Sequence, residues 1–213
     1  MSRVHLVGTL ALVAALASAC LPAPSPWVGP PAPVARVGVI GDSLTFAAEY
    51  GPGLPDTADP ATPHDLSDAL VDAGYAASLS ALIGATTEDL VELPDWPEPV
   101  ADVVVIALGS NDRNEGAVPV TAMAANLEGY LARWPDACVV LVTIAETSPW
   151  QLDVYAPEWN AHLASRADVL ADWAAVTVEH TEYLLSDGVH HTPDGRAAYR
   201  QLIVDSVGGC IPG

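Results

Sequence analysis

The sequence predicts an α/β fold of three layers, α/β/α, in which helices cover both faces of a mostly parallel, five-stranded sheet. Two observations indicate this architecture. From Arg36 onwards, short runs of β-branched and other apolar residues recur, and they are apolar on both faces, as strands covered on both sides are. Stretches with the apolar spacing of amphipathic helices separate these runs. Such alternation gives parallel strands whose carboxyl ends meet at one edge of the sheet, where ligands bind.

The expected strands are the five short apolar runs, taken in chain order. They span residues 37–40, 77–82, 103–108, 139–144 and 169–172. Each run has a length that is usual for a strand in a globular protein.

The expected helices fill the intervals between these strands. The clearest spans residues 120–134, with apolar side chains at i, i+3, i+4 and i+7, and it lies between Pro119 and Pro135. Two others span residues 65–73 and 157–170. The absence of an internal repeat fits one sheet better than a repeated array.

The last helix is expected to begin at Thr192-Pro193-Asp194. Thr192 supplies a capping hydroxyl, and proline suits the first helical position. Asp194 places a negative charge at the positive end of the helix dipole. These three residues therefore mark the start of a long C-terminal helix.

Length, composition and charge limit what the protein can be. With 213 residues, 51% of them hydrophobic, the chain can bury one core and is too short for two comfortable domains. It has 27 acidic residues against 7 arginines and no lysine, so the formal net charge is −20. This charge repels polyphosphates, and nucleic acid is therefore excluded as an expected partner.

The N-terminus has the composition of an export signal. One arginine precedes an apolar run that is too short to span a bilayer, and Ala-Ser-Ala follows at residues 17–19. We therefore expect residues 1–19 to be a signal peptide and the protein to be exported. Cys20 follows directly, as in a bacterial lipobox, although Ala17 stands where leucine is usual. Two outcomes stay open: a cell-envelope lipoprotein tethered to the membrane through a lipidated Cys20, and a freely secreted protein.

A proline-rich linker or stalk, residues 20–35, is expected to precede the folded domain, residues 36–213. Its prolines favour extended polyproline II, and a disordered segment without a spacing role is the alternative. If Cys20 takes a lipid, Cys138 and Cys210 remain as an even pair that an oxidising compartment joins in a disulfide. Two buried free thiols are the alternative.

A serine follows the first expected strand, in Gly41-Asp42-Ser43-Leu44. Its hydroxyl therefore lies at the carboxyl edge of the sheet, where a helix begins. A serine hydroxyl becomes reactive when a base removes its proton, and amide N–H groups at a helix N-terminus can bind the oxyanion that forms. Taken alone, the turn is equally typical of helix capping.

Two further turns place polar groups at the same edge. The second expected strand leads to Gly84, whose amide can approach a ligand because glycine has no side chain. The third leads to Gly109-Ser110-Asn111-Asp112, where Asn111 offers neutral N–H donors. Either turn alone fits ordinary loop geometry, but three polar turns at one edge indicate a site.

A candidate base lies near the C-terminus, in Asp187-Gly188-Val189-His190. An aspartate three residues before a histidine can bind the imidazole Nδ1–H and leave Nε2 facing the serine. His191 is the competing base, although it lies nearer the start of the last helix. The two histidines could instead bind a metal ion, but no third ligand at metal-site spacing is clear.

These segments resemble the four ordered sequence blocks of the SGNH (GDSL) hydrolase family: Gly41-Asp42-Ser43-Leu44, Gly84, Gly109-Ser110-Asn111-Asp112 and Asp187-Gly188-Val189-His190. The resemblance implies that Ser43 is the nucleophile, His190 the base and Asp187 the residue that orients the base. It also implies an oxyanion hole formed by the backbone N–H groups of Ser43 and Gly84 with the Asn111 side chain. A flavodoxin-like fold and the absence of a cofactor are further implications.

The resemblance implies acyl transfer from an ester to water through an acyl-enzyme, and it leaves the substrate open. Two expected loops, residues 50–64 and 146–159, border the site. The second carries Trp150, Tyr155 and Trp159, which suit a sugar or a short acyl chain. We expect a monomeric esterase for short acyl esters, carried by small molecules or glycans. The alternatives are an acyltransferase with the same triad and a catalytically silent envelope- or glycan-binding protein.

Overall fold

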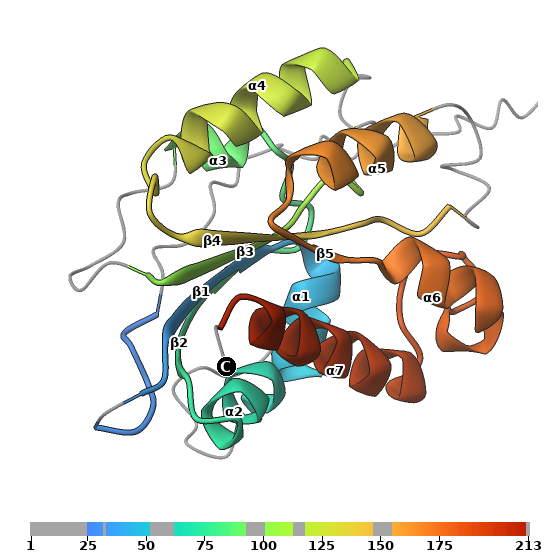
Figure 1. Cartoon of the computed structure of the whole chain (residues 1–213). Coiled ribbons are helices and arrows are strands. Elements are labelled where there is room, and N and C mark those ends of the chain that lie inside the picture. The colour runs from blue at the N-terminus through green and yellow to red at the C-terminus, as the bar shows by residue number, and fades with distance from the viewer. Residues whose placement is uncertain are drawn as a thin grey trace, which may run out of the picture.

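The computed structural model describes residues 25–31, 33–51, 62–92, 101–112, 118–146 and 155–211. At its centre lies a five-stranded sheet in which all neighbouring strands are parallel (Figure 1). The strands are β1 (Arg36–Gly41), β2 (Ala76–Ala81), β3 (Val103–Ala107), β4 (Cys138–Val142) and β5 (Val169–Ala171). Their order across the sheet is β2-β1-β3-β4-β5, so β1 lies between β2 and β3.

Helices cover both faces of this sheet (Figure 1). One layer contains α1 (Ser43–Tyr50), α2 (Asp65–Asp72) and α7 (Pro193–Gly209), and the other contains α3 (Asp89–Glu92), α4 (Val120–Leu131) and α5 (Tyr155–Arg166). The helix α6 (Trp173–Glu179) and the short 3₁₀ helix η1 (Thr181–Tyr183) connect β5 to α7. The predicted three-layer α/β/α fold is confirmed. Within the described residues, no helix has both the length and the apolar composition needed to cross a membrane.

The strands are apolar on both faces because each face packs against a helical layer. In β1, Val39 belongs to the core beneath α1, α2 and α7, whereas Ile40 belongs to the core beneath α3, α4 and α5. The parallel register places Val39 opposite Val105 and Ile40 opposite Ile106, so like-facing side chains stack in rows. Full burial of a side chain of this size contributes roughly 1.5–3 kcal/mol.

The observed strands begin and end within two residues of the predicted ones, but two helices end several residues earlier than expected. The helix expected over residues 120–134 is α4, which stops at Leu131. The helix expected over residues 157–170 is α5, which stops at Arg166. Asp168 forces the change, because its N–H donates to Val139 O at 3.0 Å and its Oδ2 accepts from Val139 N at 2.9 Å. These two bonds start the pairing of β5 with β4.

Part of the expected stalk is bound to the sheet. Residues 1–19, which we expect to be a signal peptide, and Cys20 lie outside the described residues, but Val28 forms an antiparallel bridge with Ala77. Ser25 N donates to Leu79 O, and Ser25 Oγ accepts from Leu79 N, both at 2.9 Å. The edge strand β2 has free N–H and C=O groups that an extended segment can pair with. This part of the linker is therefore not a free stalk.

Cys138 and Cys210 form a disulfide with their Cα atoms 5.9 Å apart. Cys138 begins β4, and Cys210 directly follows the last turn of α7. The bond thus joins the end of the last helix to the sheet.

Candidate active site

Ser43 is the first residue of α1, at the point where β1 ends. Asp42 caps this helix, because its Oδ1 accepts a hydrogen bond from the Leu44 N–H at 2.9 Å. Gly41 makes the tight turn possible, since a Cβ there would come within 2.0 Å of Thr45 Oγ1. The turn therefore fixes Ser43 at the carboxyl edge of the sheet.

His190 lies on the loop between η1 and α7, and Asp187 determines the shape of this loop. Asp187 Oδ1 accepts from the N–H groups of Val189 and His190, at 2.9 and 3.0 Å. Its Oδ2 lies 2.8 Å from His190 Nδ1. The Leu185 N–H donates to His190 O at 2.7 Å. One carboxylate thus holds both the backbone and the ring of His190.

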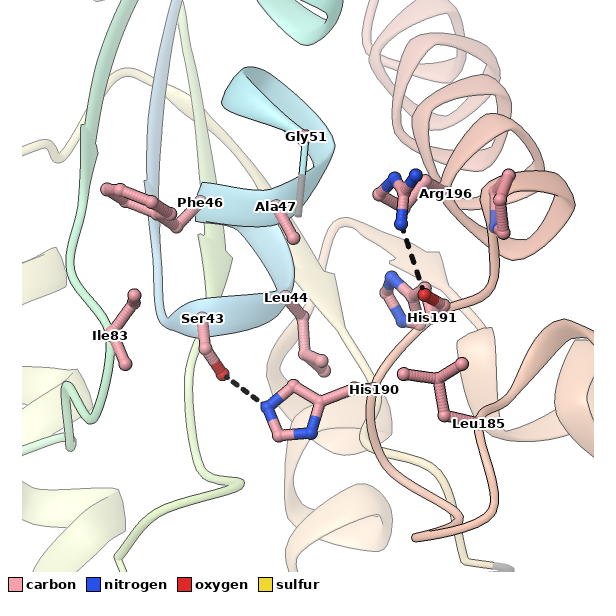
Figure 2. Close-up of a pocket in the computed structure, with 11 residues that line it drawn as sticks. Ser43, Leu44, Phe46, Ala47, Gly51, Ile83, Leu185, His190, His191 and Arg196 are labelled. Carbon is pink, nitrogen blue, oxygen red and sulfur yellow. Dashed lines mark hydrogen bonds between the residues drawn. The ribbon is translucent and has the colours of Figure 1, made fainter. Parts of the chain in front are cut away.

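His190 Nε2 lies 3.4 Å from Ser43 Oγ (Figure 2). With the Nδ1 proton shared with Asp187, Nε2 can accept the proton of the Ser43 hydroxyl. Partial burial acts to raise the pKa of Asp187, but hydrogen bonds from the His190 ring and from two backbone N–H groups outweigh it and lower this pKa. Asp187 is therefore an anion at neutral pH, and it can stabilise a positive charge on the His190 ring.

His191, the alternative base, has a different environment. It is 4% exposed and packs on the rings of Trp173 and Tyr199, with both centroid distances 4.7 Å. Neither of its ring nitrogens has a hydrogen-bond partner among the described residues. Burial lowers the pKa of His191 to about 3, and the nearby positive charges of His190 and Arg196 act in the same direction. A histidine that resists protonation is a poor base, so the geometry favours His190.

The three turns that were expected to supply oxyanion donors follow the neighbouring strands β2, β1 and β3. The N–H groups of Ser43 and Gly84 donate to no other described residue. Gly84 has φ +85°, in the left-handed region that favours glycine. Asn111 Nδ2 donates to Ala85 O at 2.9 Å and lies 3.5 Å from Asp42 Oδ2. Ala85 thus fixes one Asn111 N–H, and the second, with its longer contact, is the one available to a substrate.

Residues 39–198 match the model of the GDSL-like lipase/acylhydrolase family. This match covers more than half of the chain. The chain belongs to this family. It is accordingly a hydrolase of ester bonds.

Solved structures share the fold. A GDSL-like lipase from Bacteroides thetaiotaomicron is 20% identical over 82% of this chain and 88% of that one, with a TM-score of 0.57. A lipase/acylhydrolase from Enterococcus faecalis is 22% identical over 83% and 97%, with a TM-score of 0.59. A family 3 carbohydrate esterase from Talaromyces cellulolyticus is 18% identical over 83% and 97%, with a TM-score of 0.56. At these identities the likeness concerns the fold. No curated protein matches the chain significantly.

The buried carboxyl groups of Asp42 and Asp112 support the site of this GDSL-type hydrolase. Sequence analysis had placed both residues in turns and given them no other role. Asp42 also accepts a hydrogen bond from the Ser110 side chain, and both oxygens of Asp112 accept from the Thr87 N–H, at 3.0 and 3.1 Å. Burial raises the pKa of each acid to about 6, although these hydrogen bonds oppose the shift. The two side chains link the turns that follow β1, β2 and β3.

The aromatic residues expected on a substrate loop are not exposed. Tyr155 and Trp159 belong to α5 and are 6% and 1% exposed. The Tyr155 hydroxyl donates to Gly109 O, and Trp159 Nε1 donates to Leu108 O at 3.1 Å. They satisfy carbonyl groups just beyond the end of β3, and therefore support the third turn instead of a sugar. Trp150 lies outside the described residues.

A groove of about 500 Å³ opens beside Ser43 (Figure 2). This volume is within the range of small-molecule sites. Besides His190 and His191, the lining is mostly apolar and includes Leu44, Phe46, Ala47, Ile83, Leu185 and Pro193. Sequence analysis missed these residues because they come from separate segments that only the fold brings together. Most of the expected loop at residues 50–64 lies outside the described residues.

The alternative of a metal site gains no support from the described residues. Among them, no three His, Cys, Asp or Glu side chains gather as a metal ion requires. His190 is engaged with Asp187, and His191 is enclosed by aromatic rings.

Proposed function

We propose that this hydrolase cleaves short acyl esters through an acyl-enzyme formed on Ser43. The observation that carries the proposal is the hydrogen-bonded chain from Ser43 through His190 to Asp187, at the mouth of an apolar groove. Each member has the chemistry that its role needs: a hydroxyl, a base with a free nitrogen, and an anion that orients the base.

In the first half of the reaction, His190 Nε2 takes the proton of Ser43 as Oγ attacks the ester carbonyl carbon. The carbonyl oxygen becomes an oxyanion, which the N–H groups of Ser43 and Gly84 and the Asn111 side chain bind. The carbon–oxygen bond to the alcohol then breaks, and His190 gives its proton to the departing oxygen. The acyl group remains on Ser43.

In the second half, water attacks the acyl-enzyme. His190 removes a proton from this water, and the same donors bind the second oxyanion. The intermediate releases the carboxylic acid, and His190 returns the proton to Ser43 Oγ. Asp187 stays ionised throughout and stabilises the imidazolium in both halves.

We expect the groove to bind the acyl part of the substrate, which this proposal takes to be short. Leu44, Ala47 and Leu185 give the groove apolar walls on the side of His190, and its volume of about 500 Å³ is within the range of small-molecule sites. We include glycan-borne esters among the candidate substrates because one of the structural neighbours is a carbohydrate esterase. Tyr155 and Trp159 are buried and so give these esters no stacking surface, and Trp150 lies outside the described residues.

Export is part of the same proposal. The N-terminal sequence has the form of a signal peptide, and a disulfide suits an oxidising compartment. The mass of the mature N-terminus decides between lipidation at Cys20 and cleavage without a lipid.

A series of p-nitrophenyl esters from acetate to palmitate tests the proposed function. The value of kcat/KM should be highest among the short chains. Ser43→Ala and His190→Ala should each lower kcat by a factor on the order of 10³ or more, and the double variant should be little worse, because the two residues act as a unit. His180→Ala, at a surface pair with Glu182, is the matched control and should change little. Full activity in folded Ser43→Ala would refute the proposal.

A further inference from the structure

One wall of the groove carries a positive charge. Arg196, near the start of α7, lines the groove, and Figure 2 shows it across α1 from Ile83 and above His191. None of the described residues that line the groove is acidic. This is unexpected in a chain with 27 acidic residues and 7 arginines. The groove therefore combines apolar walls with one cation that its lining does not neutralise.

The guanidinium of Arg196 has unused donors. Its Nη1 donates to His191 O at 3.3 Å, which occupies one of its five N–H groups. No described carboxylate pairs with it. By contrast, Arg36, Arg166 and Arg200 each hold a carboxylate oxygen, at 3.9, 2.6 and 3.3 Å. A partly buried arginine without an acid is available to an anion from outside.

His191 forms the neutral wall of the groove beside Arg196. Its ring lines the same groove beside Arg196, is more than nine-tenths buried, and has no hydrogen-bond partner among the described residues. A buried polar group without a partner costs about 1–3 kcal/mol. Because both ring nitrogens are enclosed, the neutral ring forms part of the groove wall next to the Arg196 guanidinium and leaves Arg196 as the polar contact there.

We propose that the ester accepted by this groove carries an anionic group, a carboxylate in the simplest case, which Arg196 binds beside His191. The inference rests on the proposed hydrolysis at Ser43. The ester carbonyl lies at Ser43, a short apolar spacer lies along Leu44 and Ala47, and the anion reaches Arg196.

Arginine suits this role because its guanidinium can hold a carboxylate through two parallel charge-assisted hydrogen bonds. The net charge of −20 repels anions at long range, so their recognition must depend on short-range contacts in the groove.

Two series of paired esters test the inference. In the first, p-nitrophenyl hemisuccinate and hemiglutarate are compared with the butyrate and valerate of the same lengths, which places the anion on the acyl side. In the second, acetyl esters of ω-hydroxy acids are compared with acetyl esters of matching alcohols, which places it on the alcohol side. The wild-type protein should prefer the anionic member at least about tenfold in kcat/KM in one series, mainly through KM.

Variants link this preference to Arg196. Arg196→Met should reduce the ratio of anionic to neutral kcat/KM by about tenfold or more, and Arg196→Lys should keep part of the preference. Arg200→Met removes the same charge from the same helix, outside the groove, and should leave the ratio unchanged. Calorimetric titration with glutarate should show binding to the wild-type protein and weaker binding to Arg196→Met.

The inference and the proposed function fail in different ways. If neutral esters turn over with no anionic preference in either series, or if the preference survives Arg196→Met, the inference is overturned and hydrolysis at Ser43 stands. If no ester of any kind turns over, the proposed function fails. Glutarate binding then still decides whether Arg196 forms an anion site, and equal binding by Arg196→Met excludes it.

Discussion

The burial of His191 makes the stability of the protein depend on pH. Because folding lowers its pKa from 6.5 to about 3, the unfolded chain binds more protons than the folded protein between these pH values. The contribution of His191 to the free energy of unfolding therefore decreases as the pH falls from 6.5 towards 3. The His191→Leu variant has no histidine to protonate at this position, so it does not lose this stability. The Tm of the variant minus the Tm of the wild-type protein should therefore increase as the pH is lowered from about 7 to about 4, in thermal melts followed by circular dichroism.

Two buried acids act in the opposite direction. The pKa values of Asp42 and Asp112 are raised from 3.8 to about 6, so the folded protein binds more protons than the unfolded chain in this window and gains stability as the pH falls. Both proteins in the comparison share this gain, and the difference between them therefore isolates His191. A Tm gap that does not change with pH would mean that the ring is accessible to protons in the folded state.

Asn111 should act on turnover and hardly on substrate binding. Its second N–H, which has only the longer contact with Asp42, meets full negative charge when the oxyanion forms, so Asn111→Ala should cost roughly 3 kcal/mol in kcat with little change in KM. Steady-state kinetics with the best p-nitrophenyl ester measure both. Asn126→Ala, a change of the same kind on α4, is the control. A raised KM with normal kcat would make Asn111 a substrate-binding residue instead.

Spacing in the sequence was enough to pair Asp187 with His190, because side chains three residues apart in one loop can contact each other. The unpartnered state of His191 could not be predicted in the same way. It arises where Trp173 of α6 and Tyr199 of α7 close around the ring, and neither contact follows from local sequence. Nor could a role for Arg196 be predicted, because the groove that it lines is formed by segments that are distant in the sequence.

At the scale of elements, a glycine sets how closely α7 approaches the loop before it. A Cβ at Gly195 would come within 2.0 Å of Tyr183 O, so Gly195→Ala must push the first turn of α7 away and should destabilise the protein by about 2 kcal/mol. It should also lower kcat, because His190 precedes this turn. Chemical denaturation and kinetics measure the two effects.

Gly129 on α4 is the matched control. A Cβ there meets no atom within 4 Å, and Gly129→Ala should stabilise the protein by about 0.5–1 kcal/mol through helix propensity. If both substitutions change the stability alike, the contact between Gly195 and Tyr183 does not position α7.

The strands were predictable because a short run that is apolar on both faces suits a buried strand, whereas a buried helix needs a longer run. The helix α6 was not predicted, since Trp173–Glu179 is only seven residues long and contains β-branched side chains that weaken the helical pattern. Its only local signal is Asp172, whose side chain accepts from the Ala175 N–H at 3.2 Å. Likewise, the contacts of Tyr155 and Trp159 with the end of β3 depend on how α5 packs, which is why these residues were expected to be exposed.

At the scale of the whole molecule, strand order assembles the site. Because β1 lies between β2 and β3, the turn that carries Ser43 is flanked by the turns that carry Gly84 and Asn111. The sequence placed each turn after a strand, but it contained no direct information on which strands are neighbours. His190 comes from the far end of the chain, and its position depends on how α7 packs against the same sheet face as α1.

The disulfide should stabilise this whole arrangement. It joins residues that are 72 positions apart, and closing a loop of this length contributes roughly 4 kcal/mol in the chain-entropy model. The Cys138→Ser, Cys210→Ser double variant should lose about this much free energy of unfolding in urea titrations. Mass spectrometry of the unreduced mature protein provides the direct check, and free thiols at both positions would contradict the pairing.

The most direct test of the central claim is to trap the nucleophile. A fluorophosphonate should modify one residue of the folded protein, and peptide mass spectrometry should place the adduct on Ser43. Ser43→Ala should remain unlabelled, and His190→Ala should react more slowly by a factor of about 10² or more, because the hydroxyl has lost its base. An adduct on another residue, or equal labelling of folded Ser43→Ala, would contradict the assignment of Ser43 as the nucleophile.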